Sequence, residues 1–158
     1  MTAKADFTDE EWSRVRRAPL VAGLAISLAD PGGPIEAAKE SMATLKSATN
    51  PPSREQLLSE VALDISEMAQ RRDNPLKGFK PEGPNPGEGV LAELRGVVAI
   101  VGAKAAPDEA AAFGNWLVSA AQAAADAAKE GGFMGFHAVR VSDREQAMID
   151  AVKAAVTA

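Results

Sequence analysis

The sequence predicts an all-α protein, a single-domain bundle of about six to seven helices with two central apolar helices. Alanine, which has the highest helix propensity, accounts for 33 of the 158 residues. Strands favour β-branched and aromatic residues, yet tyrosine is absent and aromatic residues make up only 4% of the chain. Helix-start signals recur along the chain. A chain of this length holds one core more readily than two, so we expect one domain over 1–158.

The helix starts are marked by capping residues and by prolines. Three stretches fit the capping box, in which a Ser or Thr and an acid or amide three residues later bond reciprocally to the backbone: 8–11 (TDEE), 53–56 (SREQ) and 142–145 (SDRE). Pro34 and Pro107 suit the first helical turn. Because an interior proline removes a helical hydrogen bond, we expect a break at Pro19. The predicted helices are 8–30 (broken at Pro19), 34–48, 53–72, 88–105, 107–130 and 142–157.

Apolar patterning predicts how these helices pack. Residues 20–28 and 90–101 are apolar on nearly every side, which is typical of central helices. In 53–72, apolar residues recur every three or four positions opposite a polar stripe, which predicts a helix on the outside of the bundle. In 107–130, alanines line two sides, so we expect neighbours on both sides or a dimer contact there.

The stretch 73–89 (DNPLKGFKPEGPNPGEG) predicts a connecting loop, since it holds four prolines and four glycines. Leu76 and Phe79 are expected to attach the loop to the bundle. Four basic residues surround it, which favours either solvated charges or a docking point for an acidic partner: Arg71, Arg72, Lys77 and Lys80.

Charge and composition narrow the classes of partner. Seventeen basic and 22 acidic residues give a net charge of -5, the wrong sign for neutralising phosphates, so nucleic acid is not expected as a partner. There is no cysteine, which excludes disulfides and thiolate chemistry. The first residues are acidic and polar with no secretory pattern, and no apolar run approaches the ~20 residues that span a bilayer. We therefore expect no membrane insertion and a cytoplasmic location.

Two patterns suggest ligand sites, each with a structural alternative. Gly87, Gly89 and Ala92 match the G-x-G-x-x-A dinucleotide fingerprint, but a proline-rich loop precedes them instead of a strand, so helix-start glycines explain them better. Carboxylates could bind Mg²⁺ or Ca²⁺, or could form a solvated helix face: Asp30, Glu36, Glu60 and Asp64. The turn 30–36 (DPGGPIE) resembles the acidic turn of TerB-type helical domains of tellurite-resistance proteins, which implies a helical fold with an acidic turn.

The stretch 130–145 (EGGFMGFHAVRVSDRE) joins the last two predicted helices. Its apolar residues would either fill a gap in the bundle or form a patch that another chain covers: Phe133, Met134 and Phe136. His137, the only histidine, is expected to be a loop histidine, since no second ligand completes a metal site. The pattern GGF-x-GF…VS-x-x-E in this stretch resembles the C-terminal signature of small, Ala-rich, all-helical bacterial proteins without established activity, which implies a helical fold and no particular chemistry.

We therefore expect a non-enzymatic protein that acts by protein–protein contacts, as a homo-oligomer or an accessory subunit. The expected partner-binding residues are Phe133, Met134, Phe136, His137, Phe79 and Leu76. No motif predicts a cofactor or a catalytic residue, although one histidine and many carboxylates leave an enzyme possible. The alternative is a helical bundle that binds a metal or a small molecule through clustered carboxylates.

Overall fold

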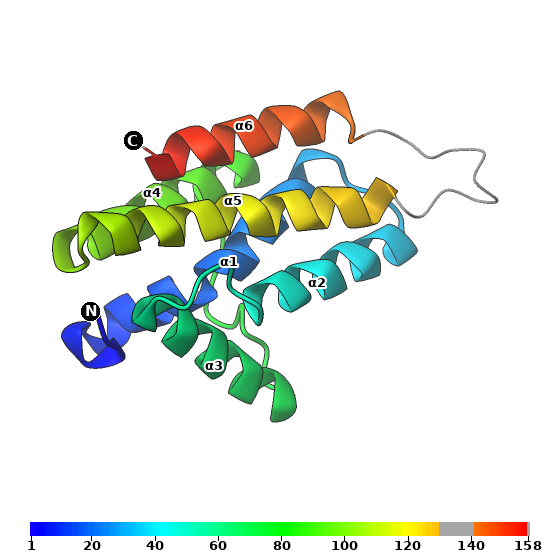
Figure 1. Ribbon diagram of the computed structural model, residues 1–158. Coiled ribbons are helices and arrows are strands. Elements are labelled where there is room, and N and C mark those ends of the chain that lie inside the picture. The colour runs from blue at the N-terminus through cyan, green and yellow to red at the C-terminus, as the bar shows by residue number, and fades with distance from the viewer. Residues whose placement is uncertain (130–140, 158) are drawn as a thin grey trace.

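The computed structural model describes residues 1–129 and 141–157, and within them every regular element is a helix (Figure 1). This confirms the predicted all-α bundle. Figure 1 shows the N-terminus and the start of α5 at one end of the bundle, and the starts of α2 and α6 at the other. The elements in order are the 3-10 helix η1 (Lys4–Asp6), α1 (Asp9–Ala29), α2 (Pro34–Ala48), α3 (Gln56–Gln70), α4 (Pro86–Lys104), α5 (Pro107–Lys129) and α6 (Asp143–Thr157).

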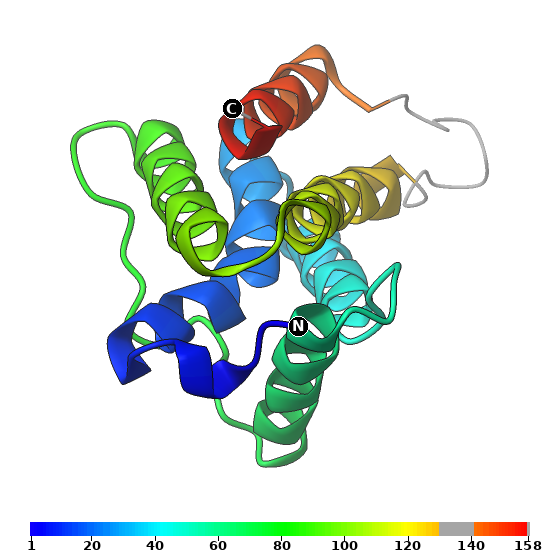
Figure 2. The same cartoon turned by 60° about the vertical axis from the view of Figure 1, so that its left-hand side comes forward.

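α1 is central, as predicted, and contacts each of the other five helices. The predicted break at Pro19 is wrong, because helical structure continues from Asp9 to Ala29. The helix changes direction along its length in Figure 2, as expected of an interior proline. Pro19 and the residues after it are buried in the core, and this packing outweighs the local cost of the missing amide.

α5 shares the centre with α1, since it too contacts all five other helices. Its side chains pack on several sides, which confirms the expectation that an alanine-lined helix has neighbours on both sides. Trp116 donates from Nε1 to the carbonyl of Ser47 in α2 at 2.9 Å, and its ring packs edge-on against Phe113. The buried alanines of this helix are Ala120, Ala121, Ala124 and Ala125.

α4 packs on α1, α5 and α6 through its apolar side and leaves Ala92, Arg95 and Ala99 exposed. It was expected at the centre, but α5 has neighbours on more sides. Among the described helices, none has the length and apolar character required to span a bilayer.

α2 crosses α1 closely at Gly23. A Cβ added to Gly23 would lie 2.2 Å from Oγ1 of Thr44, so only glycine allows this approach. The opposite side of α2 faces solvent at the edge of the bundle (Figure 1).

Four of the predicted helix starts are confirmed. Thr8 and Glu11 form the reciprocal capping box, Ser142 accepts from the backbone of Glu145, and Pro34 and Pro107 each begin a helix. The capping box at 53–56 is wrong, because α3 begins at Gln56 and the Ser53 hydroxyl makes no hydrogen bond with a described residue. A carboxylate from α5 takes over this capping role, as described below.

The loop before α4 spans 71–85, slightly earlier than the predicted 73–89, because α4 begins at Pro86 with Asn85 as its cap. Leu76 and Phe79 are half-buried and pack against the core, which confirms that they attach the loop to the bundle. Gly89 lets the loop approach α4, since a Cβ there would lie 2.6 Å from the carbonyl oxygen of Glu82. Close packing thus accounts for this glycine of the dinucleotide-like pattern.

Candidate functional site

Figure 2 shows the N-terminal segment beside α3. Two of the proposed metal ligands, Glu60 and Asp64 of α3, form hydrogen bonds with this segment. Glu60 accepts hydrogen bonds from the backbone of Lys4 and from the Gln56 side chain. Asp64 accepts from Trp12 Nε1 at 2.7 Å and from Lys4 Nζ at 2.9 Å. Both oxygens of Glu60 and one oxygen of Asp64 therefore already accept hydrogen bonds from protein donors.

The charges around Asp64 keep it ionised. Burial raises the pKa of Asp64, but the hydrogen bonds from Trp12 and Lys4, with the charges of Lys4 and Arg16, outweigh burial and leave the pKa below its ordinary value. The indole and the ammonium both donate to the same oxygen, Oδ2. Asp64 thus links α1, α3 and the N-terminal segment.

The other two proposed ligands, Asp30 and Glu36, lie at the opposite end of α1. Asp30 directly follows α1, 18 residues beyond Trp12, and a helix of that length spans about 27 Å. Glu36 lies against Gly32 and Gly33. The four carboxylates therefore do not meet at one ion, and no group of three or more potential ligands converges within 1–129 and 141–157.

Two further carboxylates, one from α2 and one from α6, lie near Asp30 at this far end, and sequence reasoning did not predict that they would be buried. Glu40 of α2 and Glu145 of α6 are both buried. Glu40 accepts a hydrogen bond from the Ser27 hydroxyl of α1, whereas the buried Oε2 of Glu145 has no hydrogen-bond partner among residues 1–129 and 141–157. Burial and the charges of Asp30 and Glu40 raise the pKa of Glu145, against the hydrogen bonds from Ser142.

Glu109 of α5 is the buried carboxylate at the N-terminal end. Its Oε1 accepts from the backbone amide of Thr2 at 3.0 Å, and its Oε2 accepts from the amide of Leu57 at 3.3 Å. Leu57 lies in the first turn of α3, where amides have no partner within the helix. Glu109 therefore caps α3 from another helix, which explains why Ser53 does not.

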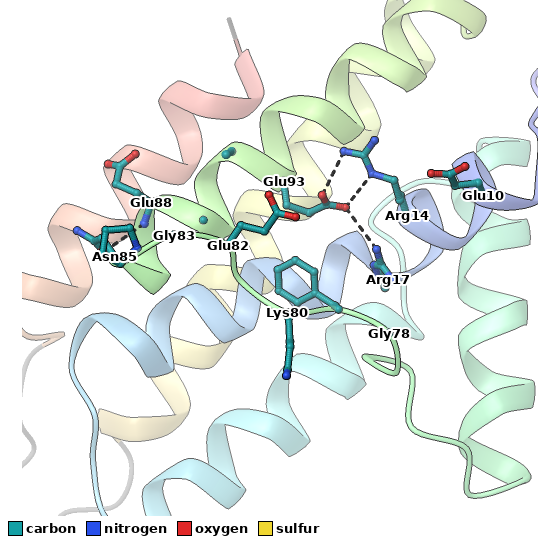
Figure 3. Close-up of a pocket in the computed structure, with 14 residues that line it drawn as sticks. Glu10, Arg14, Arg17, Gly78, Lys80, Glu82, Gly83, Asn85, Glu88 and Glu93 are labelled. Carbon is teal, nitrogen blue, oxygen red and sulfur yellow. Dashed lines mark hydrogen bonds and ion pairs between the residues drawn. The ribbon is translucent and has the colours of Figure 1, made fainter.

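An open groove with a volume of about 780 Å³ lies between α1, the loop and the start of α4 (Figure 3). Within it, Nε and Nη2 of Arg14 donate to the two carboxylate oxygens of Glu93 at 3.0 and 3.1 Å. The hydrogen bonds with Glu93 raise the pKa of Arg14, although burial opposes them. This bidentate pair joins α1 to α4.

Arg17 extends the same network to the loop. Its Nη2 lies 3.8 Å from Oε1 of Glu93, and its guanidinium lies 5.5 Å from the centre of the Phe79 ring. Figure 3 shows the Glu93 carboxylate between the two guanidinium groups, with Lys80 extending away from them. Glu93 of α4 thus binds two arginines of α1, and Arg17 also contacts the loop through Phe79.

The predicted partner-binding residues fall into two groups. Phe133, Met134, Phe136 and His137 lie outside the described residues. Leu76 and Phe79 are half-buried against the core, and Phe79 also lies under Arg17. The basic residues around the loop are all exposed: Arg71, Arg72, Lys77 and Lys80.

The structure adds exposed apolar side chains that sequence reasoning missed. Ile35 and Met42 are 69% and 73% exposed, and they lie seven residues apart on α2. Leu63 of α3 is 58% exposed. The spacing of Ile35 and Met42 was visible in the sequence, but only the packing shows that this side of α2 faces water.

Comparison with protein-family models, with curated proteins and with solved structures finds no match in any of the three.

Proposed function

We propose that the protein acts without catalysis, by contacting other polypeptide chains as a homo-oligomer or as an accessory subunit. The observation that supports this proposal is the exposure of Ile35 and Met42 on one side of α2. Residues seven apart complete about two helical turns, so both side chains project in nearly the same direction. Ala38 lies between them and is also exposed.

Burial of these exposed apolar side chains would contribute favourable free energy to binding. Single exposed apolar residues are common on soluble proteins, whereas grouped ones more often mark contact sites. Burying one such side chain in an interface contributes about 1.5 to 3 kcal/mol. Ile35 and Met42 together would therefore contribute a large share of a moderate affinity.

Site-specific cross-linking tests the proposal directly. A photoreactive amino acid replaces Met42, and in a second variant it replaces Lys153, which is exposed on α6. Both variants are produced in the cells that natively make the protein and are irradiated there. We expect the Met42 variant to form a discrete adduct with a polypeptide and the Lys153 variant to form much less. Equal labelling of both positions, or no adduct at Met42, would contradict the proposal.

A further inference from the structure

One side of α2 combines apolar and basic residues in one row, which we call the outer stripe: Ile35, Lys39, Met42 and Lys46. Lys39 is half-exposed and the other three are exposed. Lys39 follows Ile35 by four residues, and Lys46 follows Met42 by four, so each lysine lies one turn beyond an apolar side chain. Neither lysine forms an ion pair with a residue that the structure describes. Their charges are therefore available to a partner.

A second open surface, the N-terminal groove, lies between the first residues and α3 and has a volume of about 700 Å³. Leu63 gives it an exposed apolar side chain, and the nearly buried ring of Phe7 adds to the apolar lining. The groove is lined by Ala3, Lys4, Ala5, Phe7, Asp9, Glu60, Leu63 and Asp64.

The N-terminal groove carries excess negative charge. Its lining holds three carboxylates and one ammonium group, and the ammonium of Lys4 pairs with Asp64 at 2.9 Å. Glu60 accepts only from the neutral amides of Lys4 and Gln56. Asp9 forms no ion pair within the described part of the chain. Glu60 and Asp9 thus have no ion-pair partner among the described residues.

We propose that the outer stripe of one copy docks in the N-terminal groove of a second copy of this chain. Both surfaces carry exposed apolar side chains, and their charges are complementary, with lysines on the stripe and carboxylates around the groove. This inference rests on the proposed function and names the partner and the surface. Met42 would meet Leu63, while Lys39 and Lys46 would approach Glu60 and Asp9.

Charge also decides against a symmetric contact of like surfaces. Two outer stripes face to face would bring together two lysines from each copy, and two N-terminal grooves would bring together their carboxylates. Like charges in a contact oppose association. The contact joins two different surfaces, so one copy can bind a second through its stripe and a third through its groove.

A mixing experiment with two variants tests this arrangement. Met42→Asp damages only the stripe, and Leu63→Asp damages only the groove, and both positions are more than half exposed, so the fold is expected to persist. We expect wild-type mass in sedimentation and light scattering to rise with concentration above the 16.4 kDa of one chain. Each variant alone stays at one chain. An equal mixture forms a dimer, because one intact stripe and one intact groove remain.

Milder substitutions and charge-only substitutions distinguish a loss of association from a loss of the fold. Met42→Gln and Leu63→Gln keep good helix formers and are expected to weaken association by about tenfold, with unchanged helical circular dichroism. Lys39→Glu combined with Lys46→Glu is expected to weaken it at least as much, and the effect should shrink at high salt. Lys153→Glu on α6 makes the same kind of charge change away from both surfaces and should leave association unchanged.

The outcomes separate this inference from the proposed function. Self-association that persists in either Asp variant alone would overturn the stripe-in-groove contact, as would a wild-type chain that stays single at every concentration. If the protein stays monomeric but Met42 cross-links to a different polypeptide, the proposed function holds and only the identification of a second copy as the partner is wrong. If Met42 forms no adduct either, both fail.

Discussion

Glu109 and Glu145 occupy the same position, the third residue of a helix, and lie at opposite ends of the bundle (Figure 1). Both are nearly inaccessible, with 4% and 7% of their surface exposed. Glu109 receives two backbone amides, from Thr2 and Leu57. Among the residues that the structure describes, Glu145 has only its capping interactions with Ser142, and one of its oxygens has no partner.

This difference shows that burial alone does not decide what a carboxylate contributes. A buried acceptor stabilises the fold when it satisfies donors that would otherwise be unpaired. Burial and neighbouring carboxylates, in contrast, disfavour the ionised form of a carboxyl group. At the N-terminal end, carboxylates join segments far apart in sequence, whereas at the other end they repel one another.

The largest expected effect is at Glu109. Replacing Glu109→Ala leaves the amides of Thr2 and Leu57 buried without an acceptor, and each such loss costs about 1 to 3 kcal/mol. We expect the free energy of unfolding, measured by urea denaturation at pH 7, to fall by about 3 kcal/mol. Glu109→Gln keeps one acceptor oxygen and should lose about half as much.

Asp108 provides a matched control, because it is the preceding residue of α5 and is exposed. Asp108→Ala is expected to cost no more than about 0.5 kcal/mol, through its weak interaction with the helix dipole. Equal losses for Asp108→Ala and Glu109→Ala would mean that Glu109 acts only through the first turn of α5 and does not cap α3.

The next effect is at Asp64, the other acceptor at the N-terminal end. Asp64→Asn removes the charge that Trp12 Nε1 and Lys4 Nζ contact. We expect a loss of about 1 to 2 kcal/mol in the free energy of unfolding at pH 7. Glu67→Gln, an exposed change on the same helix, should stay within about 0.5 kcal/mol of wild type.

The lowered pKa of Asp64 predicts how the loss of stability in Asp64→Asn depends on pH. The pKa of Asp64 in the folded chain lies below its ordinary value, so the unfolded chain binds this proton first as the pH falls. The stabilisation is complete above the unfolded pKa of about 3.9 and is lost as the pH falls through the folded value. The difference between wild type and Asp64→Asn should therefore shrink in acid, and a constant difference would mean that the charge is irrelevant.

The sequence predicted the helices far better than the carboxylate contacts. Alanine content, capping boxes and first-turn prolines depend on residues that are neighbours in the chain, so helices such as Pro34–Ala48 were predicted correctly. The start of α3 shows the limit of prediction from neighbouring residues. Ser53 has the right local spacing for a cap, but Glu109, 52 residues beyond Leu57, takes the role.

Pro19 illustrates the same limit for backbone geometry. Its local effect predicts a break, and the burial of its surroundings maintains the helix. The proposed metal ligands failed to converge for a related reason, since spacing within one helix says nothing about which end of another helix lies nearby. Ile35 and Met42 could have been singled out from their seven-residue spacing, but only the packing of α2 on α1 and α5 shows which side is open.

The smallest expected effect, with the opposite sign, is at Glu145. Glu145→Gln keeps a side chain that fits the capping box with Ser142 and removes the charge near Asp30 and Glu40. We expect the free energy of unfolding at pH 7 to rise by about 1 kcal/mol, the low end for removing an uncompensated buried charge. The same substitution at Glu109 should lower it.

The pH dependence of Glu145 also runs opposite to that of Asp64. The folded pKa of Glu145 is raised by burial and by the two neighbouring carboxylates, so the folded chain favours the protonated form. The favourable contribution is complete below the unfolded pKa of about 4.3 and is lost as the pH rises through the folded value. The advantage of Glu145→Gln should therefore be absent in acid and grow towards neutral pH. Urea denaturation at several pH values measures this difference. If Glu145→Gln lowered the free energy of unfolding as Glu109→Gln does, the Glu145 carboxylate would not be destabilised by its neighbours, and the proposed contrast between the two ends of the bundle would be wrong.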